Sequence, residues 1–407
     1  MSDSINGSVN GLVNYFKGSY MENINLNIQE IRPEGAVITA IGVGGGGTNM
    51  ISHLAKTNPH KAIKLIAANT DVQHLEGANA NVKMKLGEKL TKGLGAGMHP
   101  DVGEKAALET YEELKQTLSG SDIVFISAGL GGGTGTGAAP VVAKAAKEVG
   151  ALTVSIVTKP FKWEGGKRTR LAEEGLRNLK AESDCIIVIP NERLLSIIPK
   201  NCGFQESFKI VNDVLARAVN GISGVILSSG ANDINVDFAD VRTVMSHKGL
   251  ALMGTGEANG DSAACDAMRM ALESPLLDNI SIKDAKGVLV NFEIHRDYPL
   301  AEIAEAMNIV DAIAADSEAD IVFGTCTLKG DAQQDFVRIT VVATGFEKEV
   351  VGDTPSVQTP ADKDLEHSRK SLQLRRASGE SYHASDDYSL FNNDSIDVPT
   401  YLRNQKD

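Results

Sequence analysis

Ala128-Gly-Leu-Gly-Gly-Gly-Thr-Gly-Thr-Gly-Ala-Ala139 is the stretch that decides the fold of this chain. It follows Asp122-Ile-Val-Phe-Ile-Ser127, an apolar β-branched run that predicts a buried strand. It precedes Pro140–Val149, whose composition predicts a helix with proline in its first turn. A glycine-rich turn between a strand and a helix lets backbone N–H groups close around an anion, and the helix N-terminus adds partial positive charge. We therefore predict a phosphate-binding loop rather than a flexible linker.

A second glycine-rich loop repeats this arrangement. Ala36–Val43 predicts the first strand, and Gly44-Gly-Gly-Gly-Thr-Asn49 leads from it into a helix expected from about Met50. Two glycine loops on two strand–helix junctions suit a nucleotide whose phosphates are held from two sides. The sequence contains no G-x-x-x-x-G-K-[ST] segment, which excludes a P-loop enzyme.

This second loop also permits a different interpretation. Gly42, Gly44 and Gly47 satisfy the G-x-G-x-x-G dinucleotide pattern, and Asp71 follows at the distance expected for a ribose contact. One alternative is therefore a nicotinamide-dependent oxidoreductase. Such an enzyme needs one glycine loop for its pyrophosphate, so this alternative leaves Gly131–Gly137 unexplained.

Composition is that of an ordinary soluble globular protein. Of 407 residues, 42% are hydrophobic and 23% are charged, and the formal net charge is −13. An acidic chain without a basic patch argues against nucleic acid as a partner. The four cysteines form no C-x-x-C pair, so neither a disulfide framework nor a zinc site is indicated. No apolar run approaches the ~18 residues of a membrane span, and no secretory signal is recognised. We expect a cytoplasmic protein without direct membrane insertion.

Strand and helix patterns alternate from Gly35 onward and define the expected domains. The alternation predicts a mostly parallel sheet with helices on both faces and ligands at the carboxyl ends of its strands. A further glycine-rich loop, Thr91–Pro100, precedes a helix expected over Glu104–Leu118. The expected segments are a flexible extension (1–34), the first domain (35–205), a central helix (206–224), a smaller α/β domain with a mixed sheet (225–346), a disordered linker (347–394) and a docking peptide (395–407).

Several of these blocks resemble the FtsZ family of bacterial tubulin-like division GTPases. Gly129–Gly137 contains the G-G-G-T-G-T-G signature, and Asn235–Asp240 is similar to the family's synergy loop. Lys159–Arg168 and Ile189–Leu195 resemble further family blocks, and Asp397–Arg403 resembles the peptide that docks on a membrane tether. The resemblance implies a tubulin-like fold: a Rossmann-like parallel-sheet GTPase domain, a central helix, a smaller α/β domain and a disordered tail.

The resemblance also implies which residues hold the phosphates of GTP or GDP. Small residues in three loops let backbone N–H groups approach the nucleotide, and the loop containing Ala96 and Gly97 is implied to sense the γ-phosphate. The implied residues are Gly45, Gly46, Gly47, Thr48, Ala96, Gly97, Gly133, Thr134 and Gly135.

Further residues are implied to read the sugar and the base. Glu164 is suited to a ribose hydroxyl and Arg168 to the phosphates or sugar. Asp213 can accept both guanine donors, N1–H and the exocyclic amine, which selects guanine over adenine. The remaining implied base contacts are Asn49, Asn191 and a stacking Phe208. From the residues alone, Glu164 and Arg168 are explained equally well as an i,i+4 helix-surface pair, and Phe208 as a core residue.

Hydrolysis is implied to need two subunits, because the first domain offers no obvious residue to position the attacking water. Asn235, Asp237 and Asp240 would complete the site of the next subunit in trans, although their spacing also permits a helix N-cap and a solvated first turn. Head-to-tail contacts of this kind do not close, so they build filaments. Mg²⁺ is expected on the nucleotide phosphates, without a dedicated protein ligand.

The resemblance therefore implies a self-assembling GTPase of the cell-division ring at mid-cell. Its expected partners are further copies of itself and, through the docking peptide, membrane-tether and regulator proteins. A second alternative is a tubulin-like scaffold that binds GTP without turnover, against which Asp237 and Asp240 argue.

Overall fold

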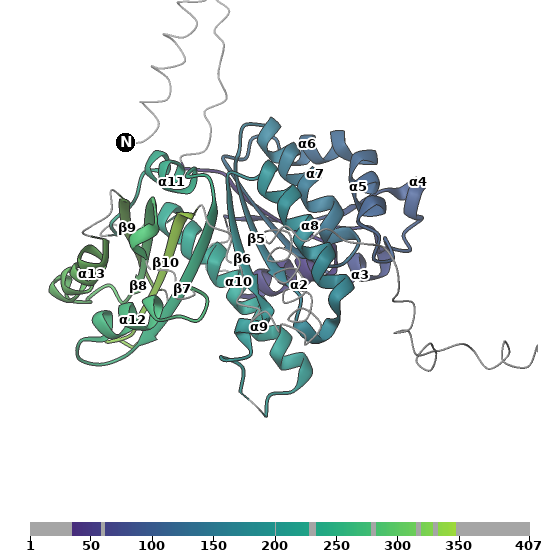
Figure 1. Cartoon of the computed structure of the whole chain (residues 1–407). Coiled ribbons are helices and arrows are strands. Elements are labelled where there is room, and N and C mark those ends of the chain that lie inside the picture. The colour runs from purple at the N-terminus through teal and green to yellow at the C-terminus, as the bar shows by residue number, and fades with distance from the viewer. Residues whose placement is uncertain are drawn as a thin grey trace, which may run out of the picture. The chain divides into compact units, whose positions relative to one another are not determined.

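A ten-stranded sheet runs through the described part of the protein, in the order β3-β2-β1-β4-β5-β6-β7-β10-β8-β9 (Figure 1). The computed structural model describes residues 35–57, 62–199, 201–227, 233–277, 282–314, 319–328 and 333–346. The predicted extension, linker and docking peptide lie outside the described residues.

The first six strands pair in parallel, which confirms the predicted parallel sheet. The β-branched runs form these strands because their side chains pack well between two helical layers. β1, β4 and β5 are buried along almost their whole length. The bounds are β1 (Ile38–Val43), β2 (Lys64–Asn69), β3 (Val82–Lys85), β4 (Ile123–Gly129), β5 (Leu152–Lys159) and β6 (Cys185–Pro190).

Helices cover both faces of this parallel part. α7 packs against α5, α6 and α8, whereas α2 packs against α10 (Figure 1). The helix expected over Glu104–Leu118 is divided at Thr110 into α5 and α6. The helices are α2 (Gly44–Thr57), α3 (Val72–Glu76), α4 (Glu88–Thr91), α5 (Pro100–Glu109), α6 (Tyr111–Leu118), α7 (Thr134–Glu148), α8 (Gly166–Glu182), α9 (Asn191–Leu194) and α10 (Phe204–Leu227), with a 3₁₀ turn at Lys162–Glu164.

Two of these helices begin earlier than the sequence predicts. α7 starts at Thr134 rather than Pro140, and α2 starts at Gly44 rather than near Met50. The glycines allow it because they let each helix N-terminus lie directly against the sheet. A Cβ on Gly47 would lie 2.2 Å from a backbone oxygen of β4. The glycine-rich loops therefore form the first turns of both helices, and they carry the backbone N–H groups that have no partner within the helix.

The remaining strands form the mixed part of the sheet, as predicted. β10 (Val337–Phe346) is antiparallel to β7 (Leu250–Ala258) and to β8 (Gly287–Ile294), whereas β8 is parallel to β9 (Asp320–Thr327). β6 and β7 join the two parts through two residue pairs. The accompanying elements are α11 (Phe238–Met245), α12 (Ala263–Leu272), a 3₁₀ turn (Ile282–Asp284) and α13 (Leu300–Ala314).

The long helix α10 lies between the parallel and the mixed parts. It contacts α2 and β5 on one side and β8, β9 and β10 on the other. By length and composition it could cross a membrane, but more than half of its most apolar stretch is buried inside the protein. Such burial is typical of a helix in the core of a protein.

Candidate functional site

Four neighbouring parallel strands end beside most of the predicted nucleotide residues. The sheet order β1-β4-β5-β6 brings the carboxyl ends of these strands to one edge, where ligands of α/β sheets bind. Gly45–Asn49 follow β1, Gly133–Gly135 follow β4, Glu164 and Arg168 follow β5, and Asn191 follows β6. The fold thus gathers residues from more than 140 positions of sequence at one edge.

Two helix N-termini meet at this edge. α2 follows β1 and α7 follows β4, and these strands are direct neighbours. The two starts nearly touch, because a Cβ on Gly44 would lie 2.7 Å from the backbone nitrogen of Gly135. The positive ends of two helix dipoles therefore coincide, which favours an anion with several charges.

The glycines of these loops divide into two kinds. A Cβ on Gly47 would lie 2.2 Å from the Ser127 carbonyl oxygen, and one on Gly135 would lie 2.5 Å from that of Gly129. These two glycines are needed for packing. By contrast, no atom lies within 4 Å of where a Cβ on Gly45 would be, and the same holds for Gly132.

The loop before α5 closes against the start of α7. A Cβ on Gly133 would lie 2.8 Å from the Ala96 Cβ. Ala96 is buried, whereas Gly97 is exposed and has a φ of +55°. The Thr70 and Thr134 hydroxyl oxygens are 2.7 Å apart and tie the end of β2 to the same point. Ala96 and Gly97 therefore lie beside the predicted phosphate loop.

Thr48 and Asn49 differ in how they present their side chains. The buried Thr48 hydroxyl donates to the Gly44 carbonyl at 2.7 Å, so it is used within α2. Asn49 is exposed. It lines a hollow of about 410 Å³ between α2 and α3, together with Asp71 and His74 among others.

Glu164 and Arg168 form the i,i+4 pair that the spacing permits. Arg168 Nη1 donates to Glu164 Oε2 at 2.5 Å, and the Phe161 N–H donates to Glu164 Oε1 at 2.9 Å. Both carboxylate oxygens thus have protein partners, yet each retains a second acceptor position.

An aromatic cluster lies at the start of α10. Phe208 contacts Phe161 and Phe204, with ring centroids 6.0 and 4.9 Å apart, and Phe161 stacks on Trp163 at 5.3 Å. Phe204 and Trp163 are 70% and 63% exposed. Phe208 is therefore half-buried in an aromatic surface rather than part of the deep core.

Asn191 and Asp213 are the polar candidates for base recognition. Asn191 is only 6% exposed, and its Oδ1 has no hydrogen-bond partner among the described residues. Asp213 accepts from His53 Nε2 at 3.2 Å and from Arg217 Nε at 2.7 Å. Burial raises the pKa of Asp213, but Arg217 and His53 outweigh it and the net pKa is lowered, so this carboxylate is ionised at neutral pH.

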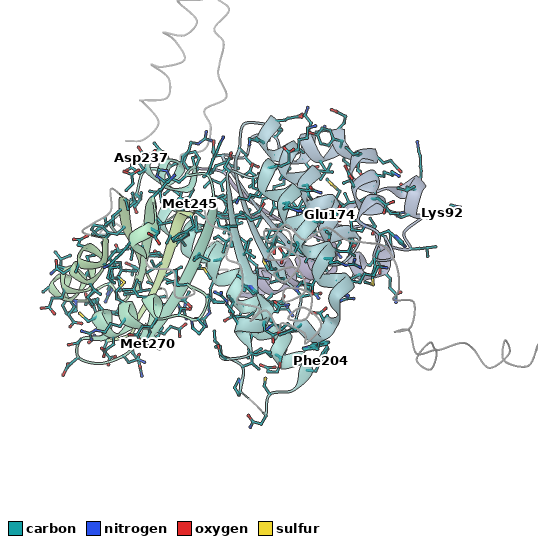
Figure 2. The ribbon with its side chains drawn as sticks, viewed as in Figure 1. Lys92, Glu174, Phe204, Asp237, Met245 and Met270 are labelled. Atoms are coloured by element: carbon teal, nitrogen blue, oxygen red, sulfur yellow. The ribbon has the colours of Figure 1, made fainter. Side chains whose placement is uncertain are left out.

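The three predicted catalytic residues are not brought to this edge. Asn235, Asp237 and Asp240 are exposed, and Asp237 caps α11 by accepting from the Ala239 N–H at 3.4 Å. Figure 2 shows Asp237 at the opposite end of the molecule from Phe204, where α10 begins. The 24 residues of α10 span about 36 Å.

Sequence reasoning missed two residues of the site, His53 and Arg217. Both carried a signal, since His53 lies four residues after Asn49 on α2 and Arg217 lies four residues after Asp213 on α10. No cluster of three His, Cys, Asp or Glu side chains suited to a metal is found in the described ranges.

The dinucleotide interpretation finds no support in this arrangement. Asp71 caps α3, where its carboxylate accepts from the His74 N–H at 3.1 Å. Both glycine loops serve one edge of the sheet, as a site that holds phosphates from two sides requires.

Comparisons with known proteins show the family of this chain. The family model described as "Tubulin/FtsZ family, GTPase domain" matches residues 37–199, and that of the "FtsZ family, C-terminal domain" matches residues 249–347. The cell division protein FtsZ of Helicobacter pylori is 47% identical over 359 residues, covering 86% of this chain and 92% of the relative. That of Azotobacter vinelandii is 44% identical, covering 92% and 98%.

Solved structures give the same result. An FtsZ dimer from M. jannaschii is 42% identical, with a TM-score of 0.71, and the match covers 83% of this chain and 92% of that one. CetZ2 from Haloferax volcanii, a GTPγS-bound protofilament, is 21% identical with a TM-score of 0.66 over 83% and 99%, a likeness of fold. Sequence, fold and site geometry together establish that this chain belongs to the FtsZ family of tubulin-like GTPases.

Proposed function

We propose that this chain stacks head to tail and that GTP is hydrolysed at the contact between two subunits. As an FtsZ-family member it is a GTP-dependent, filament-forming GTPase of cell division. The observation that carries the proposal is the distance, along the length of α10, between the glycine loops and the exposed Asn235, Asp237 and Asp240.

The phosphates are proposed to lie over the starts of α2 and α7. Gly45 and Gly132 adjoin open space, and the two helix N-termini supply N–H donors and partial positive charge. Gly46, Gly133, Thr134 and Gly135 surround this position, and the loop with Ala96 and Gly97 closes over the γ-phosphate. Mg²⁺ would be held by the nucleotide phosphates, without a dedicated protein ligand, and would neutralise their charge.

The base is proposed to lie between α2 and α10. Asp213 accepts from guanine N1–H and the exocyclic amine, and the unpaired Asn191 Oδ1 gains a donor. Asn49 adds an amide, Phe208 stacks on the ring, and Glu164 and Arg168 hold the ribose and phosphates. Adenine has no N1–H donor, so it would leave the remaining acceptor positions of the half-buried Asp213 carboxylate without partners, which selects guanine.

Catalysis is proposed to start when a neighbour's Asp237 and Asp240 approach the γ-phosphate. A water oriented by these carboxylates attacks phosphorus, the bond to the bridging oxygen of GDP breaks, and phosphate leaves. Asn235 would help to orient that water. Because the contact is heterologous and does not close, repeated stacking gives a polar filament.

Asp240→Ala tests this assignment. We expect GTP to bind with parental affinity and filaments to form in light scattering, while phosphate release falls at least about a hundredfold. Asp266→Ala, at an exposed carboxylate of α12, is the control and should hydrolyse GTP normally. Parental hydrolysis by Asp240→Ala, or turnover per subunit that does not depend on protein concentration, would exclude a shared active site.

The terminal peptide is proposed to recruit the filament to a membrane tether in the cytoplasm at mid-cell. Removal of residues 397–407 should leave hydrolysis and assembly intact, because the peptide is far in sequence from every site residue. Co-sedimentation with vesicles that carry the tether should be lost. Retained co-sedimentation would assign the docking role to another segment.

A further inference from the structure

Six charged or ionisable side chains form a continuous ladder from α2 across α10 to the mixed sheet. His53 Nε2 contacts Asp213 at 3.2 Å, and Arg217 donates to Asp213 through Nε at 2.7 Å and to Glu257 through Nη1. Arg338 donates to Glu257 at 2.9 Å and to Glu293 at 2.8 Å. We call these residues the charge ladder: His53, Asp213, Arg217, Glu257, Arg338 and Glu293.

The far end of the ladder is fixed by strand register. Arg338 of β10 pairs directly with Glu257 of β7 on one side and with Glu293 of β8 on the other. These side chains share one face of the sheet, and each is at most 34% exposed. Glu257 is therefore held in place by Arg338, independently of its contact with Arg217.

The pairing of opposite charges stabilises the charge ladder. Burial raises the pKa of Glu257, but Arg217 and Arg338 outweigh it and its net pKa is lowered. Burial likewise acts to lower the pKa of Arg338, but Glu293 and Glu257 outweigh it and raise it. Arg217, Glu257 and Arg338 each lie between two side chains of opposite charge, which favours one arrangement over many.

Arg217 is the member that joins the two halves of the molecule. Its planar guanidinium uses Nε for Asp213 and Nη1 for Glu257, a bridge that the single ammonium of lysine cannot copy. Arg217 and His53 each occupy one oxygen of Asp213. Since a carboxylate oxygen accepts two hydrogen bonds, one position remains on each for a ligand donor.

We propose that Arg217 is a positioning residue for guanine recognition, and that Glu257 and Arg338 hold it there so that the mixed sheet contributes to base selectivity. The proposal rests on the role of Asp213 proposed above. Arg217 touches the carboxylate and not the base, so it acts by fixing the plane in which Asp213 accepts two donors.

The test compares the affinities of GDP and IDP, measured by competition against a fluorescent GDP at low protein concentration. IDP retains N1–H and lacks the exocyclic amine, so the GDP-to-IDP affinity ratio reports the second hydrogen bond to Asp213. Arg217→Gln should lower this ratio about three- to tenfold, the share of one hydrogen bond. Glu257→Gln should lower it less, and Arg217→Lys should recover only part of the loss.

Controls separate positioning from a structural role and from the parent proposal. Arg269→Gln breaks an exposed ion pair on α12 and should leave the ratio unchanged. If Arg217→Gln and Glu257→Gln weaken GDP and IDP equally, the ladder is structural and the inference is wrong. If Asp213→Asn keeps the parental ratio, the role of Asp213 fails, and the inference fails with it. A folded Glu257→Gln decides the question should Arg217→Gln not fold.

Discussion

Glycine has two different roles in the phosphate loops, and the space around each Cα distinguishes them. A Cβ on Gly47 or on Gly135 would lie within 2.5 Å of a backbone oxygen. The absence of a side chain at these two positions therefore allows the helix starts to lie on the sheet. Gly45 and Gly132 have no such neighbour among the described residues. Packing explains the first pair, and the proposed approach of the phosphates would explain the second.

Gly45→Ala and Gly47→Ala should therefore behave differently. Gly45→Ala should fold with parental thermal stability and bind GTP at least about tenfold more weakly, because the methyl group would lie where the phosphates approach. Gly47→Ala should lower the melting temperature, since its Cβ overlaps the Ser127 carbonyl. Equilibrium titration and thermal unfolding of both variants measure this. Parental GTP affinity in Gly45→Ala would place the phosphates elsewhere.

At the scale of elements, the contact between α5 and α7 positions the loop that contains Ala96 and Gly97. A Cβ on Gly137 of α7 would lie 1.8 Å from the Pro100 carbonyl oxygen, at the start of α5. One on Gly103 of α5 would lie 2.5 Å from the Gly133 carbonyl oxygen. Because α5 follows directly on Ala96 and Gly97, any separation of the two helices also moves that loop.

Gly137→Ala should test this coupling. We expect the free energy of unfolding to fall by about 1–3 kcal/mol, measured by urea denaturation, because the backbone of α5 must move away. GTP affinity should fall as well, although Gly137 touches no proposed ligand position. Gly203→Ala has open space around its Cβ and should leave stability unchanged or slightly raised. An equal free energy of unfolding and an equal GTP affinity in the two variants would mean that α5 can move away from α7 without loss of stability.

The elements also show which features sequence can predict. Strands β1 and β4 were predicted to within two residues at each end, because a β-branched run between turn residues has one good solution. The starts of α2 and α7 were not, since glycine's low helix propensity is overridden by its close packing on the sheet. The spacing of Arg217 and Asp213 on α10 permitted their pairing, but the partner Glu257 is 40 residues away on β7, and only the tertiary fold brings it to Arg217.

At the scale of the whole molecule, α10 separates the proposed nucleotide-binding end from the end that carries Asp237 and Asp240. Both ends are exposed, at Phe204 and at Asp237 (Figure 2). In the proposed head-to-tail contact two different ends of the molecule meet, so the contact does not close and the resulting filament is polar.

Mixing two inactive variants should restore hydrolysis if the active site is shared. Asp240→Ala holds GTP but lacks the carboxylate, whereas Gly45→Ala carries an intact Asp240 and binds nucleotide weakly. In an equal mixture about a quarter of random head-to-tail contacts would join GTP on the first variant to Asp240 of the second. Phosphate release should then reach up to about a quarter of the parental rate, although each variant alone is nearly inactive.

The control for this mixture is the double variant, Asp240→Ala with Gly45→Ala in one chain. Mixed with Asp240→Ala it offers no contact that combines bound GTP with a carboxylate, so hydrolysis should stay absent at every ratio. In the productive mixture the rate should peak at an intermediate ratio, because both kinds of subunit are needed at one contact. A rate that stays at the sum of the separate variants, while both sediment in the same filaments, would mean that each subunit hydrolyses its own GTP.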